Sequence, residues 1–475
     1  MWKFHGSFTK GRPLRRSLNV PDKTGGNNTM SHNWNEVREQ VTRYFQDLIR
    51  INTTNPPGNE TQAAEYLAGV FQREGIEPTI LESAPGRGNV IARLKGDGRA
   101  APLLLMVHLD VVPVEPDKWT HPPFDGKIVD GYVWGRGALD TKGLAAMELM
   151  AMLLLKREGK ALARDIIFMG NADEEAGGRL GAGWIVQHHP ELIRAEYAIN
   201  EGGGFGIEFL GKKFFTCQTG EKGTARFAMR TRGRPGHASQ PHSDNAVLKL
   251  ADAIQKIGAA REAFPLHVTP TVRVFFEGIA AKLGQPYASQ LPALLDPKQY
   301  DAVMKRLPID ESMRSMIYAM LHNTVTPTML NAGTKINVIP SVAEAKCDAR
   351  LLPGFSSDDL LRELRPIIGN SVEIEFQDNT PGRESEHQTP LFETIARVMA
   401  RHAPNAPVLP YLVVGATDAR HVTKLGTRVY GFCPMLAPME ELDTVHGHNE
   451  RISIDNLLFG TRVLYDVVSE FCATS

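Results

Sequence analysis

From residue 34 to residue 200 the hydrophobic pattern alternates between stripes at helical spacing and short runs that are apolar throughout. Val37, Val41 and Leu48 fall on one helical face, whereas the run "PLLLMV" contains no polar position. Such a run is typical of a strand buried on both faces of a parallel sheet. The pattern predicts helices over 34–48, 63–71, 144–159 and 181–189, and strands over 89–94, 102–107, 165–170 and 196–200. This alternation predicts an α/β fold with a doubly wound sheet.

The pattern changes near Glu221, where strands with mixed polar and apolar positions replace the continuous apolar runs. The elements that follow have the order βαββαβ, which suits a small ferredoxin-like α+β sheet with two helices on one side. The predicted strands are 224–233, 324–331, 341–351 and 371–378, and the predicted helices are 245–260 and 356–368. The stretch 262–322 is less regular, and we expect extra helices there. The first pattern then resumes, with helices over 390–402 and 453–471 and strands over 410–414 and 427–433.

The length of 475 residues exceeds the roughly 250–300 residues at which a single core stops growing. We therefore divide the chain into a tail (1–33), a doubly wound domain (34–221 and 379–475) and an inserted domain (222–378). The first 29 residues are basic and lack the apolar segment of a secretory signal. A disordered tail and a start codon assigned upstream of Met30 remain open interpretations. A transit peptide is favoured less, because no amphipathic helix is evident there.

Composition excludes several classes of partner. The net charge is −1, so nothing indicates nucleic acid or an anionic membrane as a partner. The chain has no apolar run of about 18 residues, so we expect no membrane span. The four cysteines are far apart and form no CxxC pair, which argues against a disulfide framework or a thiolate zinc site. A reducing compartment, the cytoplasm, fits this pattern best.

Polar residues that can bind metal follow several of the predicted strands directly. In open α/β sheets, functional groups collect at the carboxyl ends of the strands. The residues in question are His108 and Asp110 after 102–107, Asp173, Glu174 and Glu175 after 165–170, Glu201 after 196–200, and Asp140 before the helix 144–159. Each one alone is also compatible with a turn, a helix cap or a solvated loop. Together the carboxylates would repel one another at low dielectric, and one or two divalent cations would remove that cost.

The motifs around these residues resemble those of the zinc-dependent metallopeptidases and deacylases of clan MH. This family includes aminoacylase, acetylornithine deacetylase, succinyl-diaminopimelate desuccinylase and carboxypeptidase S. The matching stretches occur in the order of the family and span residues 34 to 471. They are "HLDVVPV", "GRGALDTKG", "ADEEAGG", "NEGGG", "GRPGHAS", "NVIPSVAEAKCDARLLPG", "GATDARH" and "HGHNERI".

The resemblance implies a centre with two Zn²⁺ ions per chain, for which Co²⁺ can substitute. His108 and Glu201 would bind the first ion, Glu175 and His446 would bind the second, and Asp140 would bridge both. The motif "HGHNE" contains a second histidine, His448, but only His446 lies three residues before Asn449 as the family pattern requires. Asp110 would accept a hydrogen bond from His108 and fix its tautomer. The family often has a cis peptide after the bridging aspartate, and we expect one here.

The resemblance also implies catalytic and substrate-binding roles. Glu174 would be the general base, because it is the carboxylate beside the metals that no ion requires. His237 would stabilise the oxyanion in the active site of the other subunit of a homodimer formed through 222–378, which would also act as a lid. A surface loop histidine is the alternative interpretation for His237. The substrate carboxylate would contact Arg350, Asn337, Gly415 and Thr417, although Asn337 also fits an ordinary strand end.

These roles predict a dizinc hydrolase that cleaves an amide bond next to a free carboxylate, in a dipeptide or an N-acyl amino acid. A catalytically silent relative that binds small molecules or serves as a scaffold is an alternative from another class. Such a relative is expected to have lost Glu174 or a metal ligand, and this chain keeps them all. A third interpretation has one tight zinc ion and a weak second site. The sequence does not decide between a peptidase and a deacylase.

Overall fold

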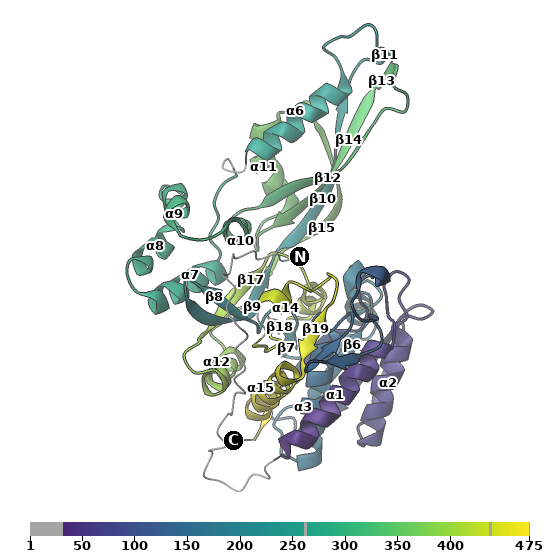
Figure 1. Ribbon diagram of the computed structural model, residues 1–475, viewed down its shortest axis with the longest axis vertical. Coiled ribbons are helices and arrows are strands. Elements are labelled where there is room, and N and C mark those ends of the chain that lie inside the picture. The colour runs from purple at the N-terminus through teal and green to yellow at the C-terminus, as the bar shows by residue number, and fades with distance from the viewer. Residues whose placement is uncertain (1–31, 261–263, 437–438, 475) are drawn as a thin grey trace.

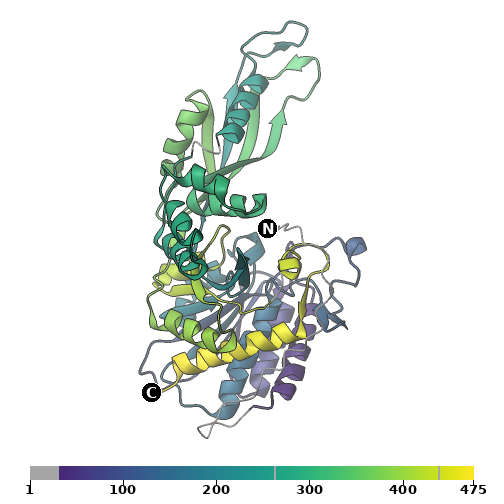
Figure 2. The same cartoon turned by 60° about the vertical axis from the view of Figure 1, so that its left-hand side comes forward.

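The structure, a computed structural model, describes residues 32–260, 264–436 and 439–474. The predicted tail, 1–33, lies outside the described residues except for its last two. A wide lower part contains a large mixed sheet, and a narrower part with a small sheet projects from it (Figures 1 and 2). Among the described helices, none is long and apolar enough to cross a membrane.

The large sheet has ten strands, and its centre is the set of continuous apolar runs that the sequence predicted. Strand β3 pairs in parallel with both β6 and β7, β18 pairs in parallel with β7, and β17 with β9. The pairs β1–β2, β2–β6 and β8–β9 are antiparallel, so the predicted mixed α/β sheet is confirmed. The strands are β1 (Pro78–Glu82), β2 (Gly88–Leu94), β3 (Leu103–His108), β6 (Ile166–Asn171), β7 (Tyr197–Asn200), β8 (Gly206–Phe209), β9 (Lys212–Glu221), β16 (Arg383–Glu384), β17 (Val408–Val413) and β18 (Arg428–Gly431).

Helices cover both faces of the central strands, as a doubly wound sheet requires. Alternate residues of β3 show this directly, because Leu103 and Leu105 belong to the core on one face and Leu104 and Met106 to the core on the other. The first face carries α1 (Trp34–Arg50), α2 (Glu60–Arg73), α3 (Lys142–Glu158), α12 (Pro390–His402) and α15 (Ile454–Cys472). The second face carries α4 (Ala182–His188), α5 (Pro190–Ile193) and α13 (Ala419–Val422).

The small sheet is antiparallel, with strand order β12-β14-β10-β15. Its strands are β10 (Gly223–Arg232), β12 (Thr324–Ala332), β14 (Val342–Leu351) and β15 (Glu373–Thr380). The apolar faces of α6 (Ala246–Ala259) and α11 (Ser357–Ile368) pack on it, so the six predicted βαββαβ elements are all present. Beyond the sheet, the short strands β11 (Gly236–His237) and β13 (Val338–Ile339) pair at the far end of the molecule (Figure 1).

Extra helices occur between α6 and β12, as the irregular stretch predicted. They are α7 (Pro270–Leu283), α8 (Tyr287–Ala293), α9 (Tyr300–Arg306) and α10 (Glu311–Leu321). Their apolar side chains, such as Phe275 and Phe276, share a core with Leu409 and Tyr411 of β17. These helices therefore cover the end of the large sheet formed by β8, β9 and β17, although they lie within the segment between two strands of the small sheet.

The remaining elements are short and lie near the loops that carry polar residues. They are β4 (Lys127–Val129), β5 (Tyr132–Trp134), β19 (Arg451–Ser453) and α14 (Met439–Leu442), with 3₁₀ turns at Pro116–Lys118, Glu174–Ala176 and Thr423–Leu425. Strand β19 pairs with β5, and this pairing brings the segment after residue 445 next to the loop that leads into α3.

Candidate metal centre

The predicted metal ligands meet at the carboxyl edge of the central parallel strands. His108 is the last residue of β3, Glu175 lies on the turn after β6, and Glu201 follows β7 directly. Asp140 and His446 come from loops, one before α3 and one before β19. The parallel pairing of β3 with β6 and β7 brings His108, Glu175 and Glu201 together, and the pairing of β19 with β5 brings the loops of Asp140 and His446 beside each other.

These five side chains form two groups that share one carboxylate. His108 Nε2 lies 2.9 Å from Asp140 Oδ1 and 3.7 Å from Glu201 Oε1. His446 Nε2 lies 2.9 Å from Asp140 Oδ2 and 3.1 Å from Glu175 Oε1. Each oxygen of Asp140 thus faces a different histidine, and in each group the candidate ligand atoms lie within 4.8 Å of one another. The peptide bond after Asp140 is cis, as expected.

His448 lies outside both groups. Its Nε2 contacts Glu115 Oε2 at 3.0 Å on the exposed surface. The backbone at His446 is left-handed, with φ of 58°, and this conformation turns the imidazole of His446 toward Asp140. Of the two histidines in "HGHNE", the geometry therefore brings only His446 to the centre.

His108 is oriented by Asp110, mainly through the main chain. Its Nδ1 donates to the backbone oxygen of Asp110 at 3.0 Å and lies 3.4 Å from the carboxylate Oδ1. This contact leaves Nε2 free to bind a metal. The Asp110 carboxylate instead accepts the backbone N–H groups of Glu174 and Glu175, at 3.1 and 3.2 Å, and the side-chain amide of Asn55 at 2.8 Å. Asp110 therefore holds the turn that carries Glu174 as well as the imidazole.

The buried acids of the site resist ionisation. Burial raises the pKa of Glu174 and of Glu201 well above the usual range, and neighbouring carboxylates, Glu201 and Asp418 for Glu174 and Asp140 for Glu201, raise it further. Burial and Asp140 also raise the pKa of Glu175. For Asp140, burial is outweighed by hydrogen bonds from the two facing histidines, and its pKa falls well below the usual range. Positive charge next to Asp140 is thus the condition under which these carboxylates can coexist.

The same carboxylates raise the pKa of the two histidines. Burial alone would lower the pKa of His108, but the carboxylates of Glu201, Asp110 and Asp140 raise it well above its ordinary value. Burial is likewise outweighed at His446, where Asp140 and Glu175 raise the pKa to about 10. A divalent cation beside each imidazole would supply this positive charge and leave the ring neutral. Imidazole nitrogens with carboxylate oxygens are the ligand set that catalytic zinc sites use, so the residues fit that metal.

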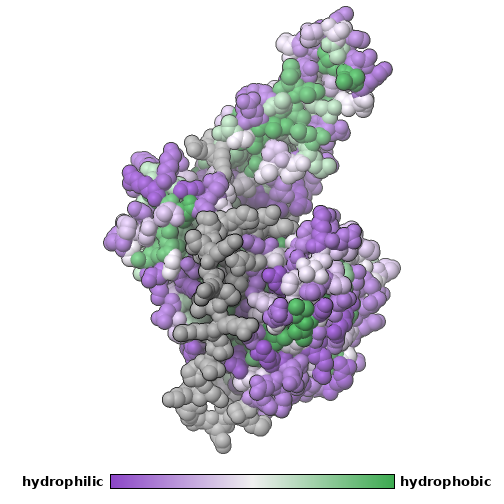
Figure 3. All heavy atoms as spheres, viewed as in Figure 1, coloured by the Kyte–Doolittle hydropathy of each residue, from purple (hydrophilic) through white to green (hydrophobic). Residues whose placement is uncertain are grey.

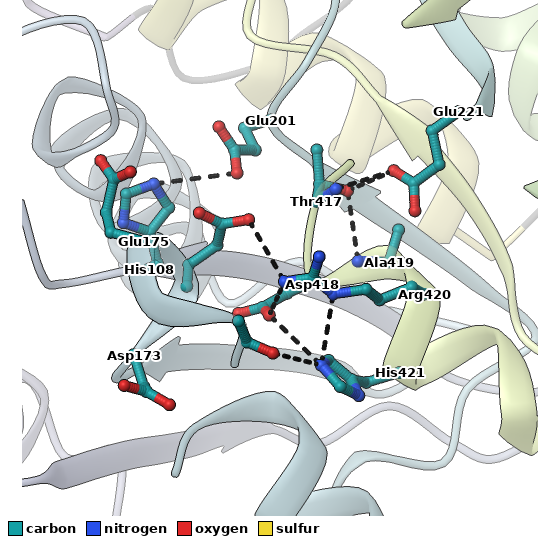
Figure 4. A network of polar contacts seen from close by, with 12 residues as sticks. His108, Asp173, Glu175, Glu201, Glu221, Thr417, Asp418, Ala419, Arg420 and His421 are labelled. Carbon is teal, nitrogen blue, oxygen red and sulfur yellow. Dashed lines mark hydrogen bonds and ion pairs between the residues drawn. The ribbon is translucent and has the colours of Figure 1, made fainter. Parts of the chain in front are cut away.

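Glu174 lies beside both groups and belongs to neither. Its side chain is mostly buried, and Arg420 Nη2 lies 3.9 Å from its Oε1. Figure 4 shows Arg420 between Asp418 and His421, with Glu175 and Glu201 in the same view. The turn before it is fixed by Asp173, whose φ is 74° and whose carboxylate accepts from Arg87 at 2.9 Å. Arg87 in turn forms a buried ion pair with Glu60 at 2.8 Å. A chain of buried polar contacts therefore fixes the position of Glu174.

A pocket of about 610 Å³ opens over the centre and has walls from both parts of the molecule. The large sheet and its loops contribute Glu174, Glu175, Glu201 and His446, and the small sheet contributes Thr224, Arg226 and Arg350. An apolar wall comes from β8, α10 and β17. Its residues are Phe205, Ile207, Met313, Met316, Tyr411 and Val413.

The predicted substrate-binding residues separate into two sets. Arg350, Gly415 and Thr417 line the pocket. The Arg350 guanidinium is paired with Asp348 at 2.6 Å. The Thr417 hydroxyl donates to Glu221 at 2.7 Å, so its hydrogen is already used within the protein.

His237 and Asn337 form the second set, and they do not line the pocket. They lie together at the far end of the projecting part, where Ala238 N donates to Asn337 O at 3.0 Å, and both are exposed. Within one chain the structure does not bring them to the metal groups.

Sequence reasoning missed three polar residues of the site. Arg420 and Asp418 belong to the motif "GATDARH", whose Gly415 and Thr417 were selected instead. Arg420 faces Glu174, and Asp418 accepts from Asn171 at 2.5 Å beneath the pocket. Glu450, the last residue of "HGHNE", accepts backbone hydrogen bonds from the turn of Asp140. The motif spacing marked all three segments, but only the fold shows what these side chains contact.

The fold and the site define an α/β protein with a candidate metal centre at the carboxyl edge of its main sheet. A family model described as "Peptidase family M20/M25/M40" matches residues 104–470, and the chain belongs to this family. The resemblance inferred from the motifs is therefore confirmed. Proteins of this family and its relatives are hydrolases of carbon–nitrogen amide bonds, and this chain is an enzyme of that class.

Individual relatives agree with this assignment. The chain is 30% identical to "Probable carboxypeptidase S-like 2" of Dictyostelium discoideum, over 76% of this chain and 70% of that protein. It is 28% identical to "N-fatty-acyl-amino acid synthase/hydrolase PM20D1" of Xenopus tropicalis, over 88% of this chain and 83% of that protein. Its fold matches the M20 family metallo-carboxypeptidase Sso-CP2 from Sulfolobus solfataricus with a TM-score of 0.69 at 18% identity, covering 91% of this chain and 99% of that chain.

The geometry predicts different metal contents for two neighbouring histidine variants. His446→Ala should lose one of the bound ions, because it removes the imidazole that faces Asp140 and Glu175. His448→Ala is the matched control and should keep the wild-type metal content, since its imidazole contacts only Glu115. Elemental analysis of the purified proteins measures both. Equal metal contents in the two variants would contradict the assignment of His446.

Proposed function

We propose that the protein is a dizinc hydrolase that cleaves an amide bond next to a free carboxylate. The observation that carries the proposal is the division of Asp140 between two groups, with one oxygen toward His108 and Glu201 and the other toward His446 and Glu175. A carboxylate shared in this way is what two metal ions about 3.5–4 Å apart require. A centre with a single tight ion would leave one of the two histidines that face Asp140 without a metal ion to bind.

His108, Asp140 and Glu201 would hold one zinc ion, and Asp140, Glu175 and His446 the other, with Co²⁺ as a substitute. Zinc ions bound there would lower the pKa of a water molecule and polarise the substrate carbonyl. Asp110 would keep Nε2 of His108 aimed at the metal by accepting the Nδ1 proton.

Glu174 would act as the general base and then as the general acid. It would accept a proton from the attacking water and pass that proton to the nitrogen of the leaving amine. The geometry supports this role, because Glu174 lines the pocket beside both metal groups and its carboxylate is used by neither. The backbone N–H of Glu174 donates to the Asp110 carboxylate, and this hydrogen bond would hold the main chain at Glu174 in place during both proton transfers.

The pocket supports a substrate with a carboxylate at one end and an apolar group at the other. Arg350 is the proposed partner of the carboxylate, and the backbone at Gly415 and Thr417 lies in the same pocket. The wall formed by β8, α10 and β17 offers an apolar surface for the rest of the substrate. Both a dipeptide with an apolar side chain and an N-acyl amino acid meet this description. The relative named as an N-fatty-acyl-amino acid synthase/hydrolase favours the second.

A silent relative that only binds small molecules is the alternative. It is disfavoured because the chain keeps every proposed ligand and Glu174, and their side chains lie together at one edge of the main sheet. A zinc-loaded protein that hydrolyses no amide in a broad substrate panel would favour this alternative.

A homodimer would explain the position of His237. This residue and Asn337 lie at the far end of the projecting part, so they would reach an active site only in another chain. Exposed apolar residues lie on the same part, along the edge strand β12, on α6 and near β13, and Figure 3 shows hydrophobic residues there. They are Val247, Leu248, Met329, Leu330, Ile336 and Val338. An unpaired edge strand with apolar neighbours is a surface that another chain can cover.

A cytoplasmic location stays a prediction.

Glu174→Gln should lower kcat by about 10²–10⁴-fold, because the amide cannot accept the proton of the attacking water. Metal content should stay at the wild-type value, since Glu174 is no ligand. Steady-state kinetics and elemental analysis of the same preparation test both statements. An active Glu174→Gln enzyme would show that another group is the base.

A panel of dipeptides and of N-acetyl, N-succinyl and long-chain N-acyl amino acids tests the substrate assignment. We expect hydrolysis to require the free carboxylate and to improve with an apolar acyl or side-chain group. Met313→Trp should reduce kcat/KM for the bulkiest apolar substrates by about tenfold or more, because the larger indole would fill pocket space beside the apolar wall. Its activity on N-acetyl substrates serves as the control and should change little. An unchanged preference would mean that α10 does not contact the substrate.

His237→Ala should abolish activity while metal content stays the same, because the side chain would serve the active site of the partner. A mixed dimer of His237→Ala and Glu174→Gln chains should regain part of the activity, since one of its two sites would be intact. No regain would argue that His237 acts within its own chain.

Leu330→Asp is a companion test. A charge on the exposed edge strand should yield a monomer by light scattering, with metal bound and activity lost.

A further inference from the structure

Glu450 is a buried carboxylate that contacts the turn of the shared ligand Asp140. Its Oε1 accepts the backbone N–H groups of Leu139 and Asp140 at 2.8 and 3.2 Å, and its Oε2 accepts that of Gly137 at 3.1 Å. The Glu450 side chain is fully buried. The three donors belong to the loop that ends at Asp140, so this carboxylate fixes the main chain from which the bridging ligand projects.

Arg136 completes the arrangement. Its Nη1 donates to Glu450 Oε2 at 2.6 Å, and its Nη2 donates to the backbone oxygen of Gly447 at 2.9 Å. Gly447 is the residue after His446. The ion pair therefore contacts the loop of Asp140 through Glu450 and the loop of His446 through Arg136, and the side chains of Arg136 and Glu450 are 2% and 0% exposed.

The loop of His446 needs such external support. His446 and Asn449 both have a left-handed backbone, with φ of 58° and 61°, a region that residues other than glycine seldom occupy. Residues keep such conformations where surrounding contacts hold them. The contacts here include the bond from Thr120 N to Asn449 Oδ1 at 2.7 Å and the bond from Gly135 N to Glu450 O at 2.9 Å.

We propose that Glu450, paired with Arg136, is a positioning residue that sets the placement of Asp140 relative to His446 and so determines the affinity of the second metal ion. The inference rests on the proposed function, because it assumes that Asp140 and His446 bind a common ion. Glu450 itself touches neither metal ligand atoms nor the pocket. It acts through the backbone of one ligand and, by way of Arg136, through the backbone next to the other.

The charge of Glu450 matters as well as its shape. All four groups that point at its two oxygens are donors, and an ionised carboxylate is the side chain that only accepts. In Glu450→Gln, the amide nitrogen would face donors and leave buried N–H groups without an acceptor. It would also leave Arg136 as a buried charge without its partner, a change that is strongly unfavourable. The loop of Asp140 would then shift away from Glu450.

The test is the metal affinity of Glu450→Gln, measured by competition with a chromophoric chelator. We expect the second ion to bind about 10–100-fold more weakly than in the wild type, with a smaller change for the first. The visible absorption spectrum of the Co²⁺-loaded protein should also change, because it reports the ligand geometry. A role limited to folding stability would lower the melting temperature and leave that spectrum unaltered.

The matched control is Glu148→Gln on α3. Glu148 is also fully buried, and its carboxylate has no hydrogen-bond partner among the described residues. This variant should keep the affinities and the Co²⁺ spectrum of the wild type. If Glu450→Gln does not fold, Arg136→Lys decides instead, because it keeps the charge but removes the fork that joins Glu450 to Gly447. Arg136→Lys should lower the affinity for the second ion and change the Co²⁺ spectrum in the same direction as Glu450→Gln.

Two results are decisive in different ways. A folded Glu450→Gln protein with wild-type affinities and spectrum would overturn the positioning role. A wild-type protein that binds fewer than two ions would instead overturn the proposed dizinc function on which the inference rests.

Discussion

Electrostatic repulsion among buried carboxylates is the constraint on which the rest of this structure depends. Asp140, Glu174, Glu175 and Glu201 lie at one edge of the main sheet with Asp418 beneath them. Burial raises the pKa of each carboxyl, and only at Asp140 do the facing histidines outweigh this effect. Two unit charges 4 Å apart interact by about 4 kcal/mol at an effective dielectric of 20. A fold of ordinary stability, about 5–15 kcal/mol, would not hold several ionised carboxylates together unless protons or cations offset their charge. In the proposed dizinc centre, the two histidines that face Asp140 would bind those cations.

The fold holds this charged cluster together by fixing its main chain. Two of the loops that carry proposed ligands donate backbone N–H groups to other buried carboxylates. Asp110 accepts from the turn of Glu174 and Glu175, and Glu450 accepts from the turn of Asp140. The additional negative charge of Glu450 is balanced by Arg136. The turns that carry the proposed ligands Asp140 and Glu175 are therefore held by carboxylates that are not themselves proposed to bind metal.

The sequence predicted the centre of this arrangement because two independent signals agree there. Continuous apolar runs identify β3 and β6 as buried parallel strands, and polar residues at their ends identify the functional edge. The motif spacing then separates His446 from His448, a distinction that hydropathy cannot make. The same signals failed for β8 and β9, whose mixed polar and apolar residues resemble those of many loops.

The local hydrophobic pattern also could not predict where α7 to α10 pack, because an amphipathic helix does not specify which sheet will bury its apolar face. Asp110 was expected to act through its carboxylate, but the main-chain oxygen makes the shorter contact with His108. Such details depend on loop conformation, which spacing along the chain does not determine.

The connection between the two parts explains how they can form a single pocket. Strand β9 passes into β10 at Lys222, and the chain returns from β15 to β16 beside it. At this crossing a Cβ on Gly223 would lie 2.2 Å from Thr380 O, so only glycine fits. The buried Lys222 Nζ donates to the backbone oxygens of Ala319 and His322, at 3.0 and 2.7 Å, at the end of α10. The crossing is thereby joined to the helix that carries Met313.

The crossing strands therefore connect the apolar wall on α10 to the small sheet. Arg350 lies on the small sheet and Glu174 on the large one, so the distance between the proposed carboxylate partner and the proposed base depends on the angle at this crossing. A substrate that contacts both residues would fix that angle, and the apolar wall of α10 would move with it. In the proposed function, recognition of the carboxylate and recognition of the apolar group would thus be coupled by geometry, even though the residues concerned lie on different elements.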